Sequence, residues 1–349
     1  MNFEKLLTGK SKNALIGILM LASFFILLPS FVKVIAWQMA PFTEDEVVIT
    51  TVTYESEDPD GSGYNLIVGN LFQPSPKFTN ETYPGIIACH GFLFGVGNIQ
   101  MNRWGVELAK RGFVVLSIDL PGNGMSIGDM DFIPRADYES TIIKDGISYL
   151  KSLDFVNDSI GLIGISYGAG IVSMSAGILG DLVDATIACN GFTNLTNWLI
   201  EALLPDMNVD FSVSNEYITL NKVGDTDFTP ENIQDLMKLY GIIKGTDKDF
   251  EGLIVPGTTQ LSRKFLKKFD AVEYLPTVKN NSMMFIHSKR DGTFNYTNQS
   301  GQGYEAIISA GKSATYLSVD DNHQLLDDPN YTAHYCIINF FEEKLKGIN

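Results

Sequence analysis

The stretch Ile160 to Gly168, IGLIGISYG, decides the fold that this chain adopts. A short apolar run ends in the pattern Gly-x-Ser-x-Gly, and a helical pattern opens at Tyr167. A sharp turn from a strand into a helix strains the central serine and leaves no room for neighbouring Cβ atoms, which explains Gly164 and Gly168. The hydroxyl of Ser166 would then project at a helix N-terminus, whose partial positive charge favours a developing oxyanion. The stretch therefore predicts a nucleophilic serine on an α/β scaffold.

Short apolar runs alternate with helical patterns on both sides of this turn. Strands are predicted at 85–89, 113–118, 160–165, 185–189, 282–287 and 314–319, and helices at 103–111, 138–153, 303–310 and 331–345, with another from Tyr167. This alternation predicts a mostly parallel sheet covered by helices on both faces. Two period-2 stretches, 46–56 and 65–72, flank a turn-rich segment and predict an antiparallel hairpin ahead of that sheet.

The alternation breaks from Phe192 to about Ala271, after the sixth strand. Helical and irregular pieces are expected there, including a helix with Thr229 as its N-cap and Pro230 at its first position. Since the chain has no internal repeat, the sequence predicts one domain over residues 43–349 with a helical cap inserted at about 192–271.

A serine hydroxyl needs an adjacent imidazole to take its proton and a carboxylate to orient that imidazole. The chain has four histidines. His287 lies within a predicted strand and His334 within the last predicted helix, while His90 precedes the serine. His323 follows the last strand, so it is the candidate base, the alternative being an ordinary loop histidine.

Two further motifs follow predicted strands. His90-Gly91-Phe92 comes after 85–89, and Asp119-Leu-Pro-Gly-Asn-Gly-Met-Ser126 comes after 113–118. Together with the serine motif, in this order, they resemble the α/β-hydrolase superfamily from about Val47 to the C-terminus. The resemblance implies an α/β-hydrolase fold and an oxyanion hole made by the backbone N–H groups of Phe92 and Tyr167. His90 is expected to hold its loop and not to react.

The same resemblance implies the acid. Asp291 lies in the loop after the strand 282–287, where the family places its aspartate, although family members often have glycine at the position of Ser288. The family's other acid position, after 185–189, holds Asn190, which is not acidic. Asp320 and Asp321 remain competitors, although they lie so close to His323 that they could instead shape its loop.

The cap would lie over the serine in such a hydrolase. Trp198, Leu199 and Leu203 are therefore candidates for lining a substrate pocket, and the alternative is that they form the small core of the cap itself. The segment 90–126 most resembles monoacylglycerol-lipase-like hydrolases and serine aminopeptidases. The serine motif is also similar to dienelactone hydrolases and to prolyl-oligopeptidase-like or dipeptidyl peptidases.

These branches differ in substrate, and the sequence has no clear acidic pair for a peptide N-terminus. The expected function is therefore a serine hydrolase that cleaves a carboxylic ester or amide through an acyl-enzyme, with a peptidase as the first alternative. A catalytically silent binding module and an acyl transferase are further alternatives. No metal, cofactor or Walker motif is present, so no cofactor is expected. A net charge of −16 makes nucleic acid a poor partner.

The N-terminal region predicts a membrane anchor. Residues 14–32 carry no charge, and as a helix they reach roughly 28 Å, enough to span a bilayer core. Three lysines precede this run and three acidic residues follow it, so the positive-inside rule places residues 1–13 in the cytoplasm. We expect an uncleaved transmembrane helix at 14–36 and an extracytoplasmic catalytic domain. A cleaved signal peptide is the rival, with only a poor cleavage site at Gln38-Met39-Ala40.

Overall fold

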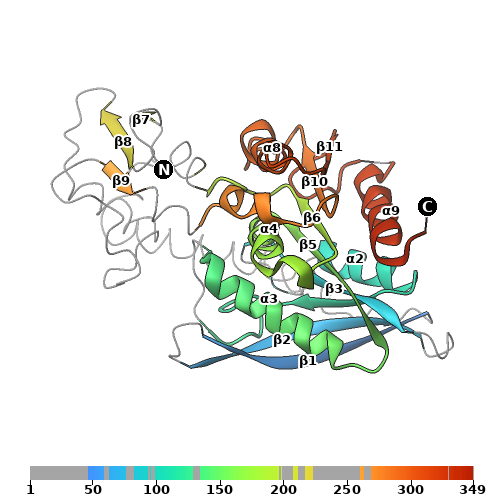
Figure 1. The fold of residues 1–349 in the computed structure, drawn as a ribbon. Coiled ribbons are helices and arrows are strands. Elements are labelled where there is room, and N and C mark those ends of the chain that lie inside the picture. The colour runs from blue at the N-terminus through green and yellow to red at the C-terminus, as the bar shows by residue number, and fades with distance from the viewer. Residues whose placement is uncertain are drawn as a thin grey trace, which may run out of the picture. The chain divides into compact units, whose positions relative to one another are not determined.

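The computed structural model describes most of the chain after residue 45 (Figure 1). The described residues are 46–58, 63–75, 82–92, 95, 99–128, 134–195, 198, 207–210, 217–222, 260–262, 269–328 and 330–348, with the three segments between 207 and 262 described through their backbone alone. The expected anchor at 14–36 and the helix expected from Thr229 lie outside them. Within these ranges, no helix is long and apolar enough to cross a membrane.

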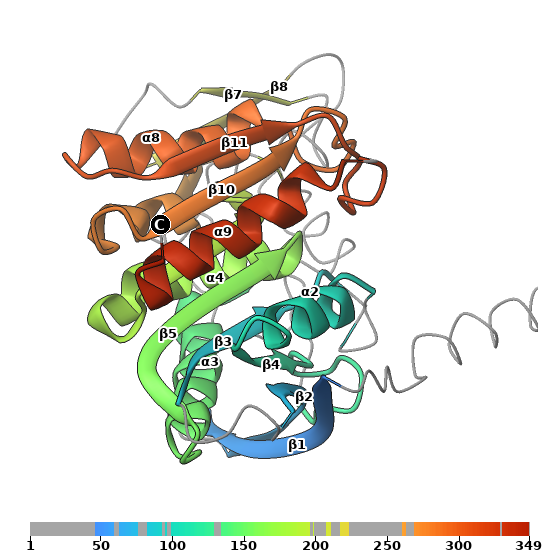
Figure 2. The same ribbon diagram turned by 90° about the vertical axis from the view of Figure 1, so that its right-hand side faces the viewer.

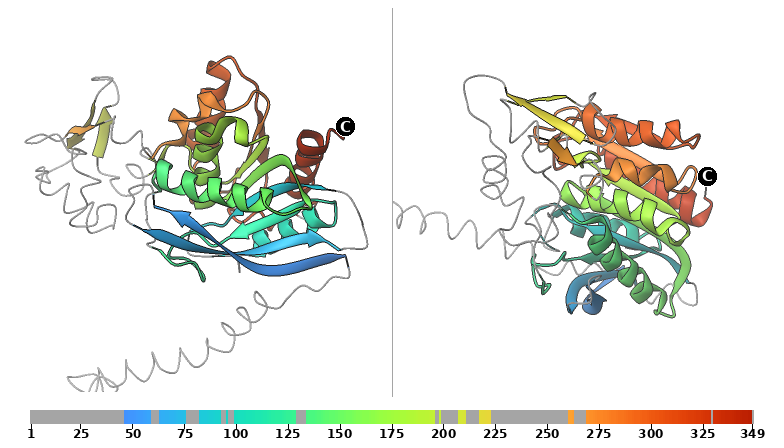
Figure 3. Two further views of the ribbon diagram at one scale, coloured as in Figure 1. Left: turned by 60° about the horizontal axis from the view of Figure 1, so that its bottom comes forward. Right: turned by 60° about the vertical axis from the view of Figure 1, so that its left-hand side comes forward.

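Eight strands form one sheet in the order β1-β2-β4-β3-β5-β6-β10-β11. Their bounds are β1 Val47–Glu57, β2 Tyr64–Pro74, β3 Tyr83–Cys89, β4 Val114–Ile118, β5 Val156–Ile165, β6 Ala185–Cys189, β10 Met283–Ser288 and β11 Thr315–Val319. All pairs from β4 to β11 are parallel, whereas β1 and β2 pair antiparallel with each other and β2 pairs antiparallel with β4. The predicted mostly parallel sheet and its hairpin are thus confirmed, and the hairpin, blue in Figure 3, forms one edge of the sheet.

Helices cover both faces of this sheet. They are α2 Ile99–Ala109, α3 Ala136–Lys151, α4 Tyr167–Leu179, α8 Gln302–Ser309 and α9 Thr332–Lys346, with short turns η2 Gly180–Leu182, η4 Ala271–Glu273, η5 Leu275–Thr277 and η6 Thr297–Gly301. Figure 2 shows α2 and α9 in front of the strands. The helices α3, α4 and α8 pack on the opposite face.

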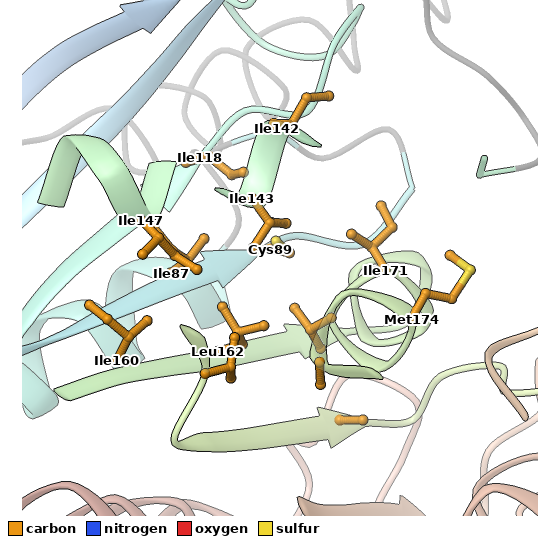
Figure 4. Close-up of a cluster of buried hydrophobic side chains, with 14 of the residues drawn as sticks. Ile87, Cys89, Ile118, Ile142, Ile143, Ile147, Ile160, Leu162, Ile171 and Met174 are labelled. Carbon is orange, nitrogen blue, oxygen red and sulfur yellow. The ribbon is translucent and has the colours of Figure 1, made fainter. Parts of the chain in front are cut away.

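Alternation along the central strands produces two separate cores. In β3, Ile87 belongs to the core under α3 and α4, while Ile86 belongs to the core under α2 and α9. Figure 4 shows the first core, where Ile142 and Ile171 from the helices lie above the sheet. Each buried side chain of this size stabilises the fold by about 1.5–3 kcal/mol. The strands are apolar on both faces because both are covered.

The insertion at about 192–271 was predicted to be helical, and part of it is a β-sheet instead. Three short strands, β7 Met207–Asp210, β8 Tyr217–Lys222 and β9 Gln260–Ser262, form an antiparallel sheet of their own in the order β7-β8-β9. Residues 207–210 and 218–221 each alternate apolar and polar side chains over four positions, which suits a strand and is too short for a helix. Residues 207–210, 217–222 and 260–262 of this insertion therefore form a small sheet.

Candidate active site

Ser166 occupies the turn between β5 and α4. Its backbone lies in the left-handed region, with φ 56° and ψ −119°, a conformation that costs a non-glycine residue about 1–3 kcal/mol. A Cβ atom on Gly164 would overlap the carbonyl of Gly168, and one on Gly168 would overlap the end of β3 at Cys89. The turn holds only with glycine at both places. The Ser166 side chain is half-buried at the carboxyl edge of the sheet.

The structure brings Ser166, His323 and Asp291 together from three separate loops. The Oγ of Ser166 lies 3.0 Å from Nε2 of His323, and Nδ1 of His323 lies 2.9 Å from Oδ2 of Asp291. An ionised carboxylate only accepts hydrogen bonds, so the Nδ1–H group donates to Asp291. Nε2 is then free to accept the proton of the Ser166 hydroxyl, which is the arrangement that a general base requires.

Asp291 is held as a buried anion. Its side chain has no exposed surface, and its Oδ1 accepts the backbone N–H groups of Thr293, at 2.7 Å, and Phe294, at 3.0 Å. Burial alone would raise the pKa of this carboxyl group, but hydrogen bonds from His287, His323 and the Phe294 backbone hold the pKa well below its usual range. Asp291 is therefore ionised at neutral pH.

The competing acids have other partners. Asp320 pairs with the guanidinium of Arg290 at 2.8 Å and is largely exposed. Asp321 is buried, and its Oδ1 accepts the backbone N–H groups of Asn322, at 2.7 Å, and Asp327, at 2.8 Å. Both residues shape the loop that carries His323, as their proximity in sequence suggested.

Asn190 connects the loops that follow β6, β10 and β11. Its side-chain amide donates to the carbonyl oxygens of Asn322, at 3.1 Å, and His323, at 2.8 Å. Its Oδ1 accepts the backbone N–H of Ser288 at 2.6 Å, and the hydroxyl of Ser288 donates to the carbonyl of Asp321. The residue is fully buried with φ 46°, a conformation that asparagine tolerates better than most side chains. From the sequence alone, Asn190 stands out only as a position where an acid is absent.

His287 is a second residue that the sequence analysis did not place at the site. Its Nε2 lies 3.2 Å from Oδ2 of Asp291, and neither side chain has exposed surface. The available signal was the spacing: His287 ends a predicted strand four residues before Asp291.

The loop expected to supply an oxyanion donor packs against the helix α4. The Phe92 and Tyr167 rings have centroids 5.6 Å apart, and a Cβ on Gly168 would come within 2.6 Å of the His90 carbonyl. His90 donates from Nδ1 to the Gly91 carbonyl at 2.6 Å and accepts the Leu120 backbone N–H at Nε2, at 3.1 Å. Those contacts tie the two loops after β3 and β4 together. His90 is fully buried, and both of its ring nitrogens are engaged in these hydrogen bonds.

A row of aromatic rings in successive contact connects Tyr167, in the serine turn, to His323. The Tyr167 ring contacts the Phe192 ring at 6.2 Å, Phe192 contacts Phe294 at 6.1 Å, and Phe294 contacts the imidazole of His323 at 5.8 Å. Trp198 packs on Phe294 at 5.3 Å and donates from its indole to the Thr293 carbonyl at 2.8 Å. Of the predicted pocket residues, Trp198 thus lies beside the site, whereas Leu199 and Leu203 lie outside the described residues.

Across the described ranges, no group of three or more His, Cys, Asp or Glu side chains is placed to hold a metal ion. The chemistry that the described residues support is proton transfer and nucleophilic attack.

Residues 38–235 match the model of the X-Pro dipeptidyl-peptidase (S15) family, which is more than half of the chain. The match includes the Ser166 turn and ends before Asp291 and His323. No curated protein sequence matches the chain.

Solved structures share the fold. A protein described as a dipeptidyl aminopeptidase IV from Bacteroides ovatus superposes with a TM-score of 0.59 and 16% identity, over 87% of this chain and 37% of that one. Est1E from Butyrivibrio proteoclasticus, with bound ferulic acid, gives 0.56 and 19%, over 83% and 99%. An acylaminoacyl peptidase from Pyrococcus horikoshii gives 0.56 and 18%, over 86% and 42%. The chain thus spans less than half of the two peptidases, and at these identities the likeness confirms the α/β-hydrolase fold alone.

Proposed function

Because the chain belongs to the X-Pro dipeptidyl-peptidase (S15) family, we propose that it is a serine hydrolase with Ser166 as nucleophile, His323 as general base and Asp291 as the carboxylate that orients the base. The observation that carries the proposal is the position of the His323 ring, 3.0 Å from the Ser166 hydroxyl and 2.9 Å from Asp291. The strained backbone of Ser166 and the buried charge of Asp291 support the same roles.

The reaction follows from these contacts. Oγ of Ser166 attacks the carbonyl carbon of the substrate while Nε2 of His323 takes the hydroxyl proton. Backbone N–H groups of Phe92 and Tyr167 would stabilise the resulting oxyanion. The tetrahedral intermediate collapses as His323 returns the proton to the leaving amine or alcohol, which leaves an acyl ester on Ser166. His323 then deprotonates a water molecule that attacks this ester, and the acid is released.

Two substrate classes are supported, an X-Pro amide and a carboxylic ester. The family description names X-Pro dipeptides, and one structural relative was solved with an aryl carboxylic acid, ferulic acid. The aromatic side chains beside His323, including Phe294 and Trp198, suit a flat apolar group such as a proline ring or an aryl ring. The preference for esters that the sequence suggested stays a prediction.

The decisive experiment labels the full-length chain, solubilised in detergent, with a fluorophosphonate probe and locates the adduct by mass spectrometry. An adduct on Ser166 that is absent from the Ser166→Ala variant is expected. Folded wild-type protein that gives no adduct would refute the proposal and favour a binding module. The substrate class follows from comparing Ala-Pro-p-nitroanilide with p-nitrophenyl esters, using Ser166→Ala as the blank in both assays.

For the N-terminal region, we propose that residues 14–36 cross a lipid bilayer. Residues 1–13 would then lie in the cytoplasm, and residues 43–349 would lie on the extracytoplasmic side of the membrane. The support is the charge-free run at 14–32 and the lysines ahead of it. Alkaline extraction should leave the full chain in the membrane pellet, and external protease should degrade residues 43–349 on intact cells. A chain that is extracted by alkali, or fully protected from the protease, contradicts this topology.

A further inference from the structure

Two imidazole rings converge on one carboxylate oxygen in the proposed active site. Oδ2 of Asp291 lies 2.9 Å from Nδ1 of His323 and 3.2 Å from Nε2 of His287. The triad chemistry uses only the first of these contacts. Asp291 therefore has four hydrogen-bond donors, two backbone N–H groups at Oδ1 and two imidazoles at Oδ2.

The partners of His287 determine which of its nitrogens carries the proton. Nε2 also lies 3.1 Å from the carbonyl oxygen of Phe294, and both oxygens near this nitrogen are acceptors. Nε2 must therefore bear the hydrogen. In the neutral ring, Nδ1 then accepts, and the hydroxyl of Ser300 donates to it at 2.6 Å. Both ring nitrogens therefore have partners: the two acceptors at Nε2 fix the tautomer, and the Ser300 hydroxyl satisfies Nδ1.

The ring is also fixed by its surroundings. His287 has no exposed surface and lies one residue before the end of β10, so its backbone is held by the parallel pairing of β10 with β11. Ser300 lies in η6, a π-helical turn, and the adjacent Gln299 accepts the backbone N–H of Thr193 at 2.9 Å. π-helical turns are uncommon and occur frequently at functional sites. This turn therefore supplies the hydroxyl that pairs with Nδ1 of His287.

We propose that His287 is a positioning residue for the proposed catalytic triad: its Nε2–H group holds the Asp291 carboxylate in place and shares the negative charge of that carboxylate with His323, while Ser300 anchors the opposite ring nitrogen. The inference rests on the proposed function, because it gives His287 a role only through Asp291 and His323. A purely structural histidine would need neither the shared oxygen nor the enforced tautomer.

The charge effect has a definite sign. A donor on Oδ2 weakens the attraction between Asp291 and a protonated His323, because it withdraws charge from the shared oxygen. Loss of that donor should stabilise protonated His323, which is inactive as a base, and the acidic limb of the activity profile should move to higher pH. The charged groups on the neighbouring loops include Lys289, which is exposed, and Arg290, which pairs with the exposed carboxylates of Asp320 and Asp327. Asp321 bonds within its own loop. The neighbouring strand β6 presents the uncharged Asn190.

The test measures the second-order rate of fluorophosphonate labelling at Ser166 over a pH range that brackets imidazole titration. His287→Phe keeps a ring of similar shape without a donor, whereas His287→Gln restores an N–H donor. We expect His287→Phe to label about 10- to 100-fold more slowly, with its acidic limb at higher pH, and His287→Gln to recover most of both properties. His334→Gln, on α9, is the matched control and should keep the wild-type limb.

A second variant covers the case in which His287→Phe does not fold. Ser300→Ala leaves the imidazole and the two acceptors at Nε2 in place but removes the hydroxyl that anchors Nδ1, so a smaller displacement of the limb in the same direction is expected. Folded His287→Phe or Ser300→Ala protein with the wild-type rate and limb would overturn the positioning role while leaving the proposed function intact. A wild-type chain that is not labelled at Ser166 would overturn the proposed function itself.

Discussion

The side-chain amide of Asn190 donates a 2.8 Å hydrogen bond to the backbone carbonyl of His323, across a sequence separation of 133 residues. The same side chain accepts the backbone N–H of Ser288, at the end of the strand that leads to Asp291. One buried amide therefore fixes the distance between the loop that carries the proposed base and the loop that carries the proposed acid. An aspartate, which the fold family also uses at this place, could not donate to a carbonyl group.

Asn190 gives the first prediction. Asn190→Asp should lower both the stability and the labelling rate of Ser166, because a buried carboxylate would face two carbonyl oxygens without a donor. Asn190→Gly tolerates the positive φ and loses only the hydrogen bonds, so we expect it to cost about 1–3 kcal/mol in the free energy of unfolding. Urea unfolding and fluorophosphonate labelling measure the two effects. Wild-type stability and labelling in Asn190→Asp would show that the hydrogen bonds of the Asn190 side chain do not hold the two loops in place.

The sequence was sufficient to predict the scaffold because its signals are local. Apolar runs of strand length, separated by amphipathic helices, place β3 to β6, β10 and β11 within one or two residues of their observed bounds, except for the start of β5. The Ser166 turn was also predictable, since the glycines on both sides have no alternative that fits. Strand order then brings the loops after β5, β10 and β11 to one edge of the sheet.

The remaining parts of the site depend on side-chain contacts that no local pattern encodes. The sequence places His287 at the end of a predicted strand, and its four-residue spacing from Asp291 indicates no contact until the loop folds back. The sequence shows Asn190 only as a position without an acid, although its amide group makes three hydrogen bonds to segments distant in the chain. The short strands β7 and β8 are expected from the sequence to be helical or irregular, because about four alternating residues give only a weak signal.

Asp291 is the subject of the second prediction. Asp291→Asn should lower turnover by about 10⁴-fold, because an amide N–H placed at Oδ2 would force His323 into the tautomer that cannot accept the serine proton. The Oδ1 contacts to Thr293 and Phe294 can persist, so thermal unfolding should change much less than turnover. Steady-state assays with circular dichroism as the folding control measure both. Wild-type turnover in this variant would transfer the role to another carboxylate.

A third prediction concerns the glycine that follows the serine turn. Gly168→Ala should prevent normal folding or displace the oxyanion loop, because its Cβ would overlap backbone atoms of Cys89 and come within 2.6 Å of the His90 carbonyl. Gly63→Ala is the matched control, since nothing lies within 4 Å of a Cβ at that position. Soluble yield and urea unfolding should separate the two variants. If Gly168→Ala were as stable and as readily labelled as Gly63→Ala, the close approach of α4 to β3 would be wrong.

The buried histidine of the oxyanion loop makes stability depend on pH. Burial lowers the pKa of His90 from 6.5 to about 4, with the hydrogen bond to Gly91 opposing that shift in part. The unfolded chain therefore binds a proton between these values that the folded chain does not, and stability is lost as the pH falls through that window, by roughly 3 kcal/mol. Urea unfolding at several pH values should show this slope, and His90→Gln should reduce it. An unchanged slope in His90→Gln would assign the loss to other groups.

The last prediction separates substrate recognition from chemistry. Trp198 contacts Phe294, which contacts the imidazole of His323, so the indole lies beside the proposed acyl site without touching the reacting atoms. Trp198→Ala should lower kcat/KM about 2- to 10-fold for the substrate that the enzyme prefers, whether Ala-Pro-p-nitroanilide or an aryl ester. Labelling by a small alkyl fluorophosphonate should stay near the wild-type rate, because it requires only the triad. Trp198→Phe keeps an aromatic ring but loses the hydrogen bond to the Thr293 carbonyl. Its kcat/KM should therefore lie between the values of the wild type and Trp198→Ala. Equal losses in hydrolysis and labelling would mean that Trp198 supports the Asp291 loop and does not line the substrate site.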